Sequence, residues 1–147
     1  KKTIPKIKFE GRVQYIKKGK LKKILKKREK LLLDGCHSEK SAKNLYSYLK
    51  ELKEPIYGIW GMKKDKSPDK FIKNFRNIFK KVVTVTIPGE SNSIKDYQLK
   101  KVSEDQGNFT QTAKSLREAL KKCSDKNKKL IVIFGSLYLV GYALSKN

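Results

Sequence analysis

Two short turns hold the residues whose types and spacing are best suited to chemistry. The first, Asp34-Gly35-Cys36-His37, follows the apolar run Leu31–Leu33, and His37 is the only histidine in the chain. If a helix follows this turn, its first backbone N–H groups favour an anion, and Gly35 lets the backbone approach that anion closely. A histidine there can donate a hydrogen bond to a phosphate or carboxylate. The alternative is a structural turn in which Asp34 accepts a hydrogen bond from its own backbone.

A second turn of the same kind, Gly135-Ser136, follows the apolar run Leu130–Phe134. Ser136 can cap the next helix and still offer its hydroxyl group to a ligand, or it can act as a cap alone. The loop Gly61–Lys66 closes another expected strand, and its glycine and lysines suit an anion as well as they suit a solvated loop. We expect the two strand-to-helix turns to open on the same edge of one sheet.

The familiar catalytic motifs are absent from the sequence. It contains no GxxxxGK(S/T) phosphate loop, no GxGxxG, no HExxH and no GxSxG. The chain therefore lacks the usual means of holding ATP and Mg²⁺ by itself. Cys36 and Cys123 show no metal-binding spacing, which predicts reduced thiols in a cytoplasmic protein and no metal site.

Length and composition indicate one folded domain over residues 1–147, with 37% hydrophobic residues and a formal net charge of +23. Such a charge attracts polyanions, so a Lys-rich nucleic-acid-binding module is an alternative reading. The basic residues are nearly all lysine and are spread over every segment, which favours a compositional bias over a binding face.

The run Leu130–Leu144 is shorter than the ~20 residues that a membrane span needs. Because the chain starts without Met, we expect a piece of a longer protein.

The elements that must position these turns alternate between strand and helix. Lys17–Lys30 fits either a helix or the second arm of a hairpin, and Gly107–Thr112 fits a loop or a very short strand. The residue pattern predicts strands at Arg12–Ile16, Leu31–Leu33, Ile56–Trp60, Val82–Thr86 and Leu130–Phe134. It predicts one helix that begins after Ser38 or Ser41, and a second along the apolar stripe Phe71, Ile72, Phe75, Ile78 and Phe79. Further helices are predicted over Ile94–Glu104, Ala113–Cys123 and Leu137–Leu144. This order predicts an α/β fold, a doubly wound and mostly parallel sheet with an N-terminal antiparallel strand or hairpin. In such sheets ligands bind beyond the carboxyl ends of the strands.

Five segments occur in the same order in one known family. They resemble the C-terminal domain of bifunctional folylpolyglutamate synthase/dihydrofolate synthase, a relative of the Mur ligases, over nearly the whole chain. The segments are Gly11-Arg12-Val13-Gln14, Leu32-Leu33-Asp34-Gly35-Cys36-His37, Gly61-Met62-Lys63-Lys64-Asp65-Lys66, Ile87-Pro88-Gly89-Glu90 and Phe134-Gly135-Ser136-Leu137-Tyr138-Leu139-Val140-Gly141. The resemblance implies a Rossmann-like Mur ligase C-terminal domain.

The resemblance also implies an ATP-dependent amide ligase. In that family a carboxylate of dihydropteroate or folate becomes an acyl phosphate, which the amine of L-glutamate attacks. The central domain carries the phosphate loop and most Mg²⁺ ligands, and the C-terminal domain closes over the nucleotide and contributes to glutamate binding. We therefore expect a monomer, inactive without the central domain of the same enzyme, that binds no membrane and binds polyanions at most weakly and without specificity.

Four residues acquire roles through the resemblance. Arg12 matches a hinge arginine that reaches ATP, and Asp34 matches an aspartate on the nucleotide side. His37 matches a catalytic histidine near the transferred phosphate or the glutamate, and Ser136 matches a serine on the glutamate side. The family usually has Asn-Pro after the histidine, whereas this chain has Ser38-Glu39. The stretch Lys17–Lys30 is longer than usual, and the connection Gln106–Thr112 is shorter, which predicts a reduced edge strand.

Overall fold

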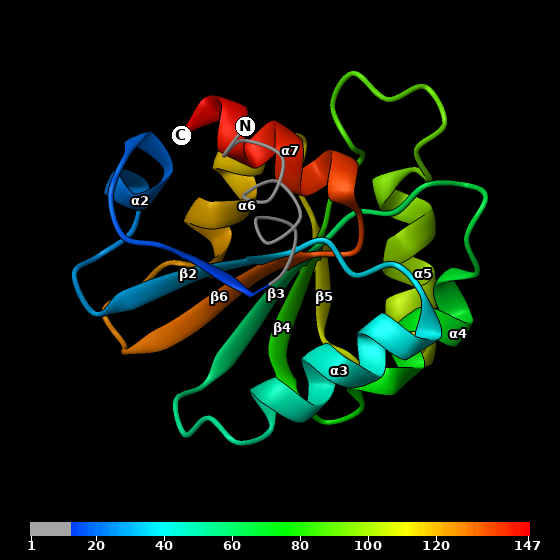
Figure 1. Ribbon diagram of the computed structural model, residues 1–147, viewed down its shortest axis with the longest axis horizontal. Helices are drawn as coiled ribbons and strands as arrows, with labels where there is room; N and C mark the ends of the chain where they lie inside the picture. The colour runs from blue at the N-terminus through cyan, green and yellow to red at the C-terminus, as the bar shows by residue number, and fades with distance from the viewer. Residues whose placement is uncertain (1–12) are drawn as a thin grey trace, which may run out of the picture.

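The computed structural model describes residues 13–147, so Arg12 lies outside the described residues. Six strands form one sheet in the order β1-β2-β6-β3-β4-β5 (Figure 1). The strands are β1 (Gln14–Ile16), β2 (Glu29–Asp34), β3 (Ile56–Trp60), β4 (Phe79–Thr84), β5 (Thr110–Thr112) and β6 (Lys129–Phe134). β1 is antiparallel to β2, and the other neighbours pair in parallel. This confirms the predicted α/β sheet, its antiparallel N-terminal strand and its short edge strand.

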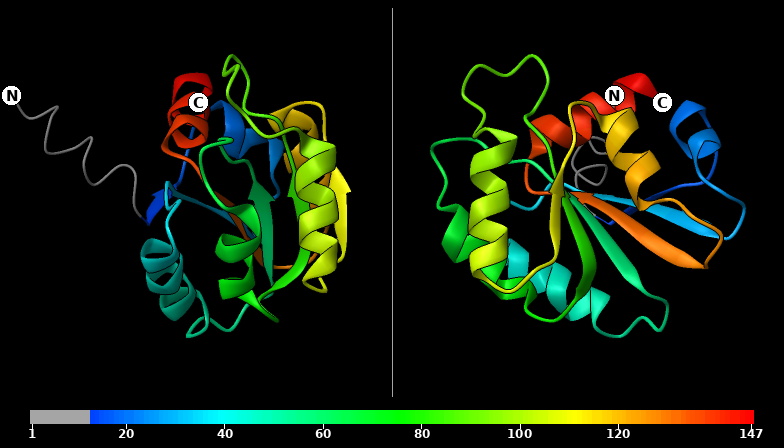
Figure 2. Two further views of the ribbon diagram at one scale, coloured as in Figure 1. Left: turned by 90° about the vertical axis from the view of Figure 1, so that its right-hand side faces the viewer. Right: turned by 180° about the vertical axis from the view of Figure 1, so that it is seen from behind.

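Helices cover both faces of the sheet (Figures 1 and 2). Apolar clusters place α2 (Lys20–Ile24), α6 (Leu116–Cys123) and α7 (Leu137–Lys146) on one face. The other face carries α3 (Glu39–Leu49), α4 (Pro68–Ile72), the 3₁₀ turn η1 (Lys73–Phe75) and α5 (Asp96–Asp105). A parallel sheet covered on both sides needs continuously apolar strands. β6 meets that need, since its last five residues are apolar and all six, Lys129 included, are buried at the centre of the sheet. None of the helices in the described part of the chain has the length and apolar character to cross a membrane.

Two ambiguous segments take definite forms. Lys17–Lys30 contains the short helix α2 and then enters β2, so the hairpin formed by β1 and β2 has a helix in its connection. At the start of α3, Ser38 is the N-cap and accepts a hydrogen bond from the Ser41 N–H. Ser41 returns a bond through its own side chain, which makes a capping box from both candidate caps.

The predicted helical stripe Phe71–Phe79 is wrong in its second half. The helix ends in the 3₁₀ turn at Phe75, the backbone reverses at Asn77 with a φ of 63°, and Phe79 opens β4. The apolar spacing persists because Phe75 and Phe79 pack on the same ring, Phe134, at centroid distances of 5.2 and 5.1 Å. A helix and a following strand thus share one apolar cluster, which helical spacing alone cannot distinguish from a longer helix.

The register of the sheet brings the candidate turns together. Asp34 pairs with Phe134, and Phe134 also pairs with Trp60. Each of these residues is the last of its strand, and the three strands are parallel neighbours. The turns that follow them therefore leave the sheet side by side at its carboxyl edge, as predicted for the two strand-to-helix turns.

Candidate functional site

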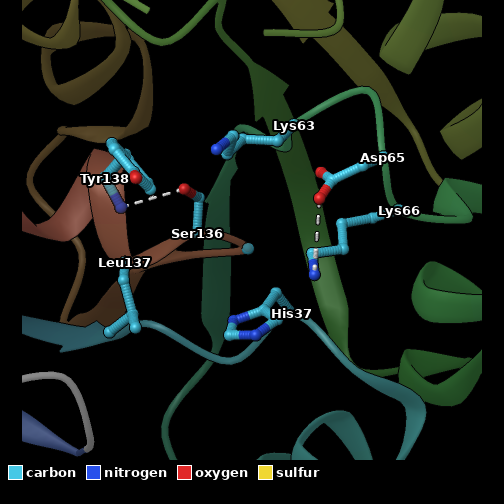
Figure 3. Close-up of a pocket in the computed structure, with 8 residues that line it drawn as sticks. His37, Lys63, Asp65, Lys66, Ser136, Leu137 and Tyr138 are labelled. Carbon is cyan, nitrogen blue, oxygen red and sulfur yellow. Dashed lines mark hydrogen bonds and ion pairs between the residues drawn. The ribbon is translucent and has the colours of Figure 1, made fainter. Parts of the chain in front are cut away.

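A pocket of about 240 Å³ lies where the three turns meet at the carboxyl edge of the sheet. Figure 3 shows His37, Lys66, Lys63 and Ser136 around one hollow, together with Tyr138 at its rim. Its full lining is His37, Lys63, Asp65, Lys66, Gly135, Ser136, Leu137 and Tyr138. The structure therefore brings the predicted residues His37 and Ser136 into one site and adds the lysines of the third loop.

Asp34 lies beneath this surface and holds the first turn together. It is 5% exposed, and its carboxylate accepts hydrogen bonds from the Cys36 N–H at 2.9 Å and the Val13 N–H at 3.1 Å. The first bond forms the structural turn that was the alternative role of Asp34 in the sequence analysis. The second bond connects this turn to the start of β1. In this structure Asp34 shapes the site and is not among the residues that line the pocket.

Cys36 connects the two strand-to-helix turns. Burial raises the pKa of its thiol well above the usual value, and the neighbouring charge of Asp34 raises it further. A hydrogen bond from the Gly135 N–H acts in the opposite direction, because it favours the thiolate. The raised pKa keeps Cys36 a neutral, buried contact between the turns, consistent with the predicted reduced thiol.

His37 is oriented by its own turn. Its Nδ1 lies 3.1 Å from the carbonyl oxygen of Gly35, and its backbone N–H donates to the Ser41 hydroxyl. A carbonyl oxygen can only accept, so Nδ1 carries the proton of this bond. That leaves Nε2 for a ligand, as an acceptor in the neutral ring and as a donor in the imidazolium ion.

Ser136 caps α7 and retains one donor. Its Oγ accepts from the backbone N–H groups of Tyr138 at 3.0 Å and Leu139 at 3.4 Å, and the residue is 3% exposed. Capping is therefore one real role of this serine. Because Oγ accepts both bonds, the hydroxyl proton stays available to donate to an anion in the pocket.

Lys63 and Lys66 bring positive charge to the pocket from the loop after β3. Lys63 pairs with Ser93 in a β-bridge, which ties this loop to the segment before α5. Lys66 lies 3.8 Å from Asp65, a long contact between partly exposed side chains that contributes little. With the His37 ring nearby, the lysines make a site that suits phosphate or carboxylate groups.

Tyr138 is the residue that sequence reasoning did not single out as a site residue. It is 57% exposed on the first turn of α7, and its ring centre lies 4.2 Å from the Lys63 ammonium. A large aromatic side chain exposed beside a pocket is a known mark of binding surfaces. Its position two residues after Ser136 was the available signal, but only the fold shows that Lys63 faces it.

A second hollow of about 230 Å³ adjoins the first and shares His37, Asp65 and Lys66 with it. It lies between the start of α3 and the start of α4, with Lys70 on its far side. The described residues contain no group of three or more His, Cys, Asp or Glu side chains that could hold a metal ion. The site thus presents cationic and hydrogen-bonding groups for an anionic ligand.

Comparisons with known proteins agree with this architecture. A model of the family described as dihydrofolate synthetase, C-terminal domain, matches residues 17–146. Comparison with curated protein sequences gives no match.

Solved structures of similar fold include three synthases. Folylpolyglutamate synthase of Mycobacterium tuberculosis, complexed with ADP and AMPPCP, is 22% identical, with a TM-score of 0.70, over 79% of this chain and 29% of that one. FolC of E. coli, in complex with DHPP and ADP, is 16% identical, with a TM-score of 0.73, over 92% and 30%. Folylpolyglutamate synthase of Thermotoga maritima is 23% identical, with a TM-score of 0.74, over 92% and 30%. These likenesses establish the fold, and the chain spans less than a third of each of these proteins.

Proposed function

The chain belongs to the family of dihydrofolate synthetase C-terminal domains, and from that premise we propose that it forms one side of the active site of an ATP-dependent ligase. The ligase joins L-glutamate to dihydropteroate or folate. The observation that carries the proposal is the convergence of His37, Lys63, Lys66 and Ser136 on one pocket at the carboxyl edge of the sheet. Nucleotide-bound structures of similar fold support the use of ATP by the whole enzyme.

The reaction has two steps. A carboxylate oxygen of the pterin substrate attacks the γ-phosphorus of ATP, and ADP leaves, which produces an acyl phosphate. The amine of L-glutamate then attacks the acyl carbon, loses a proton, and expels inorganic phosphate to form the amide. In both steps negative charge develops on oxygen atoms of the reacting groups. The site therefore needs positive groups and hydrogen-bond donors that are already in position before the reaction.

The pocket residues can be assigned by their chemistry. Lys63 and Lys66 face the transferred phosphoryl group or a glutamate carboxylate, where their positive charge is most useful, and His37 offers its Nε2 to the same group. Ser136 donates its hydroxyl proton to a carboxylate of glutamate. Asp34 acts by holding the first turn, and a direct contact to the nucleotide remains a proposal. Arg12 is proposed as a nucleotide ligand from the resemblance alone.

The rest of the site must come from another part of the enzyme. The chain has no GxxxxGK(S/T) phosphate loop, and its described residues offer no metal-binding group, so no step through Mg²⁺ is assigned to this domain. We propose that a central ATPase domain of the same enzyme holds ATP and Mg²⁺ and that this domain closes over it. We further propose that the enzyme is a cytoplasmic monomer.

The test uses the complete enzyme that carries this domain. His37→Ala should lower kcat by about 100-fold or more, a loss typical of a residue that acts in the transition state. The free energy of unfolding should change by less than about 1 kcal/mol, because the His37 side chain is largely outside the core. Lys40→Ala, a change to an exposed residue at the start of the same helix, is the matched control and should leave kcat unchanged.

A second experiment measures the activity of the isolated 147-residue chain. It should show no glutamate- or ATP-dependent ligation, and adding a separately produced central domain should restore measurable turnover. Ligation by the pure chain would contradict the proposed division of labour. Normal turnover of His37→Ala in the complete enzyme would contradict the assignment of the pocket.

A further inference from the structure

A second groove, of about 440 Å³, lies at the opposite edge of the sheet from the His37 pocket. Four lysines line it, Lys17, Lys22, Lys27 and Lys30, together with Glu29 and apolar residues of β1 and β2. It is built where β1 ends, beside α2 and the first residues of β2. Because β2 is parallel to its neighbour β6, this is the amino edge of the sheet. Ligase chemistry at the carboxyl edge does not use this groove.

The positive charge of the groove is concentrated in one segment. Nine of the fourteen residues from Lys17 to Lys30 are Lys or Arg, and Glu29 is the only acidic residue among them. Lys17, Lys27 and Lys30 are exposed. The groove therefore differs from the even spread of lysine elsewhere, which a compositional bias would produce.

The one acidic residue of the segment does not neutralise these lysines. Glu29 is 1% exposed, and its carboxylate accepts from the Lys26 N–H at 2.7 Å, the Ser124 hydroxyl at 2.6 Å and the Asp125 N–H at 2.7 Å. Its ion pair is with Lys129, in the interior, at 3.6 Å. Glu29 is one of the residues that line the groove, but its carboxylate is engaged by these partners and not by the groove lysines.

Few carboxylates other than that of Glu29 lie near the lysines of the groove. Lys30 pairs with Glu54 at 3.2 Å, but its side chain is 57% exposed. Across residues 13–147, no carboxylate lies within 4.0 Å of the ammonium groups of Lys17, Lys22 or Lys27. Lysines gathered around one groove with fewer counter-charges than ammonium groups repel each other, and a bound polyanion would remove that cost.

The sheet register increases this repulsion. Ile16 pairs with Leu31 in the last pair between β1 and β2, so Lys17 and Lys30 are the next residues along the two strands. Like charges opposite each other across a ladder are destabilising. An anion placed between them would turn this repulsion into attraction.

We propose that this groove binds the phosphodiester backbone of nucleic acid without sequence preference. Lysine is a mobile point charge that binds phosphate, whereas reading of bases favours arginine, and none of the described residues that line the groove is an arginine. Sequence-independent binding of nucleic acid rests on phosphate contacts of this kind.

The experiment compares two triple variants of the 147-residue chain that lose the same charge. The groove variant is Lys17→Gln/Lys22→Gln/Lys27→Gln. The control is Lys43→Gln/Lys73→Gln/Lys101→Gln, which changes exposed lysines on α3, η1 and α5. Binding of a fluorescent 12-mer of deoxythymidine is measured by anisotropy over a range of salt concentrations, and circular dichroism checks that both variants are folded. Unlabelled polyglutamate, single-stranded DNA and a DNA duplex are the competitors.

We expect the groove variant to bind the oligonucleotide at least ~10-fold more weakly at low salt, with the control within ~2-fold of the parent chain. The slope of log K against log salt should fall by about 2 in the groove variant, because three phosphate contacts are lost from a single strand. Equal losses in the two variants would overturn the proposal and leave net charge as the cause. Absence of binding at low salt would overturn it too, as would stronger competition by polyglutamate than by unlabelled DNA, whether single-stranded or duplex.

Discussion

The Lys63 ammonium lies 4.2 Å from the centre of the Tyr138 ring. This contact joins the loop after β3 to the first turn of α7, two segments more than seventy residues apart in sequence. It holds a positive charge at the rim of the pocket that also contains His37 and Ser136. At a partly exposed site such a contact contributes about 0.5–1 kcal/mol, enough to favour one position of a flexible lysine.

Removing the Lys63 charge should impair the complete enzyme more than it affects folding. We expect Lys63→Met to lower kcat/KM by about 10- to 100-fold, the range of one lost charge-assisted hydrogen bond. Lys64→Met is the matched control, because Lys64 is exposed in the same loop and does not line the pocket. Steady-state kinetics with varied L-glutamate and ATP measure both. An equal effect of the two substitutions would argue against a role for Lys63 in the site.

Gly135 should be far less replaceable than Gly141, although both lie in the last segment of the chain. Gly135 has a φ of +109°, and an added Cβ would collide with the Gly61 carbonyl oxygen and the Trp60 ring. We expect Gly135→Ala to lower the free energy of unfolding by at least about 2 kcal/mol. Gly141 lies in α7 with open space around it, so Gly141→Ala should raise stability by about 0.5–1 kcal/mol. Urea denaturation of the two variants checks the contrast, which a similar effect of both would refute.

The buried ion pair of Lys129 and Glu29 should be a major determinant of stability. Both side chains are fully buried, and Lys129 also donates to the Cys123 carbonyl oxygen at 2.7 Å. Lys129→Met would leave the Glu29 charge without its cation, which costs about 3–5 kcal/mol in comparable cases. Lys128→Met changes an exposed neighbour and should stay within about 0.5 kcal/mol of the parent. Chemical denaturation at neutral pH measures both, and comparable stabilities would show that the pair is not needed.

Asp125 should make the stability of the fold depend on pH in acid. Its hydrogen bond from Lys129 lowers the pKa of its carboxyl group, and the Asn127 N–H lowers it further. A carboxyl group with a lowered folded pKa stabilises the fold above its unfolded pKa of about 3.9, and that contribution disappears as the pH falls through the folded pKa. The parent chain should therefore melt at a higher temperature than Asp125→Asn at pH 7. The difference should shrink below about pH 4 in thermal melts, and a constant difference would contradict the assignment.

The sequence indicated much of the fold because its local signals agree. Apolar runs such as Leu130–Phe134 identify buried parallel strands, and Ser38 marks the start of a helix through its capping chemistry. The prediction that a helix continues to Phe79 was wrong because of tertiary packing. Phe75 and Phe79 pack on Phe134, so an apolar stripe ran across a turn that the chain makes at Asn77.

The sequence indicated only some of the residues of the candidate site. His37 and Ser136 were identified because each follows a strand, and parallel strands end on a common edge. The lysines after β3 suited a solvated loop equally well, and the position of Tyr138 two residues after Ser136 did not by itself indicate a site residue. Their part in the pocket depends on β6 lying between β2 and β3, an order that no local signal specifies.

Local signals in the sequence indicate which segments form strands and helices, where the anion-favouring turns lie, and that the chain resembles a ligase domain. These properties follow from backbone preferences and apolar periodicity within short stretches of chain. Three further relationships are visible only in the folded chain: Lys63 faces Tyr138, Asp34 is buried beneath the pocket, and lysines of Lys17–Lys30 line a groove. Those relationships arise from strand order and register, which depend on long-range packing and which local residue preferences do not encode.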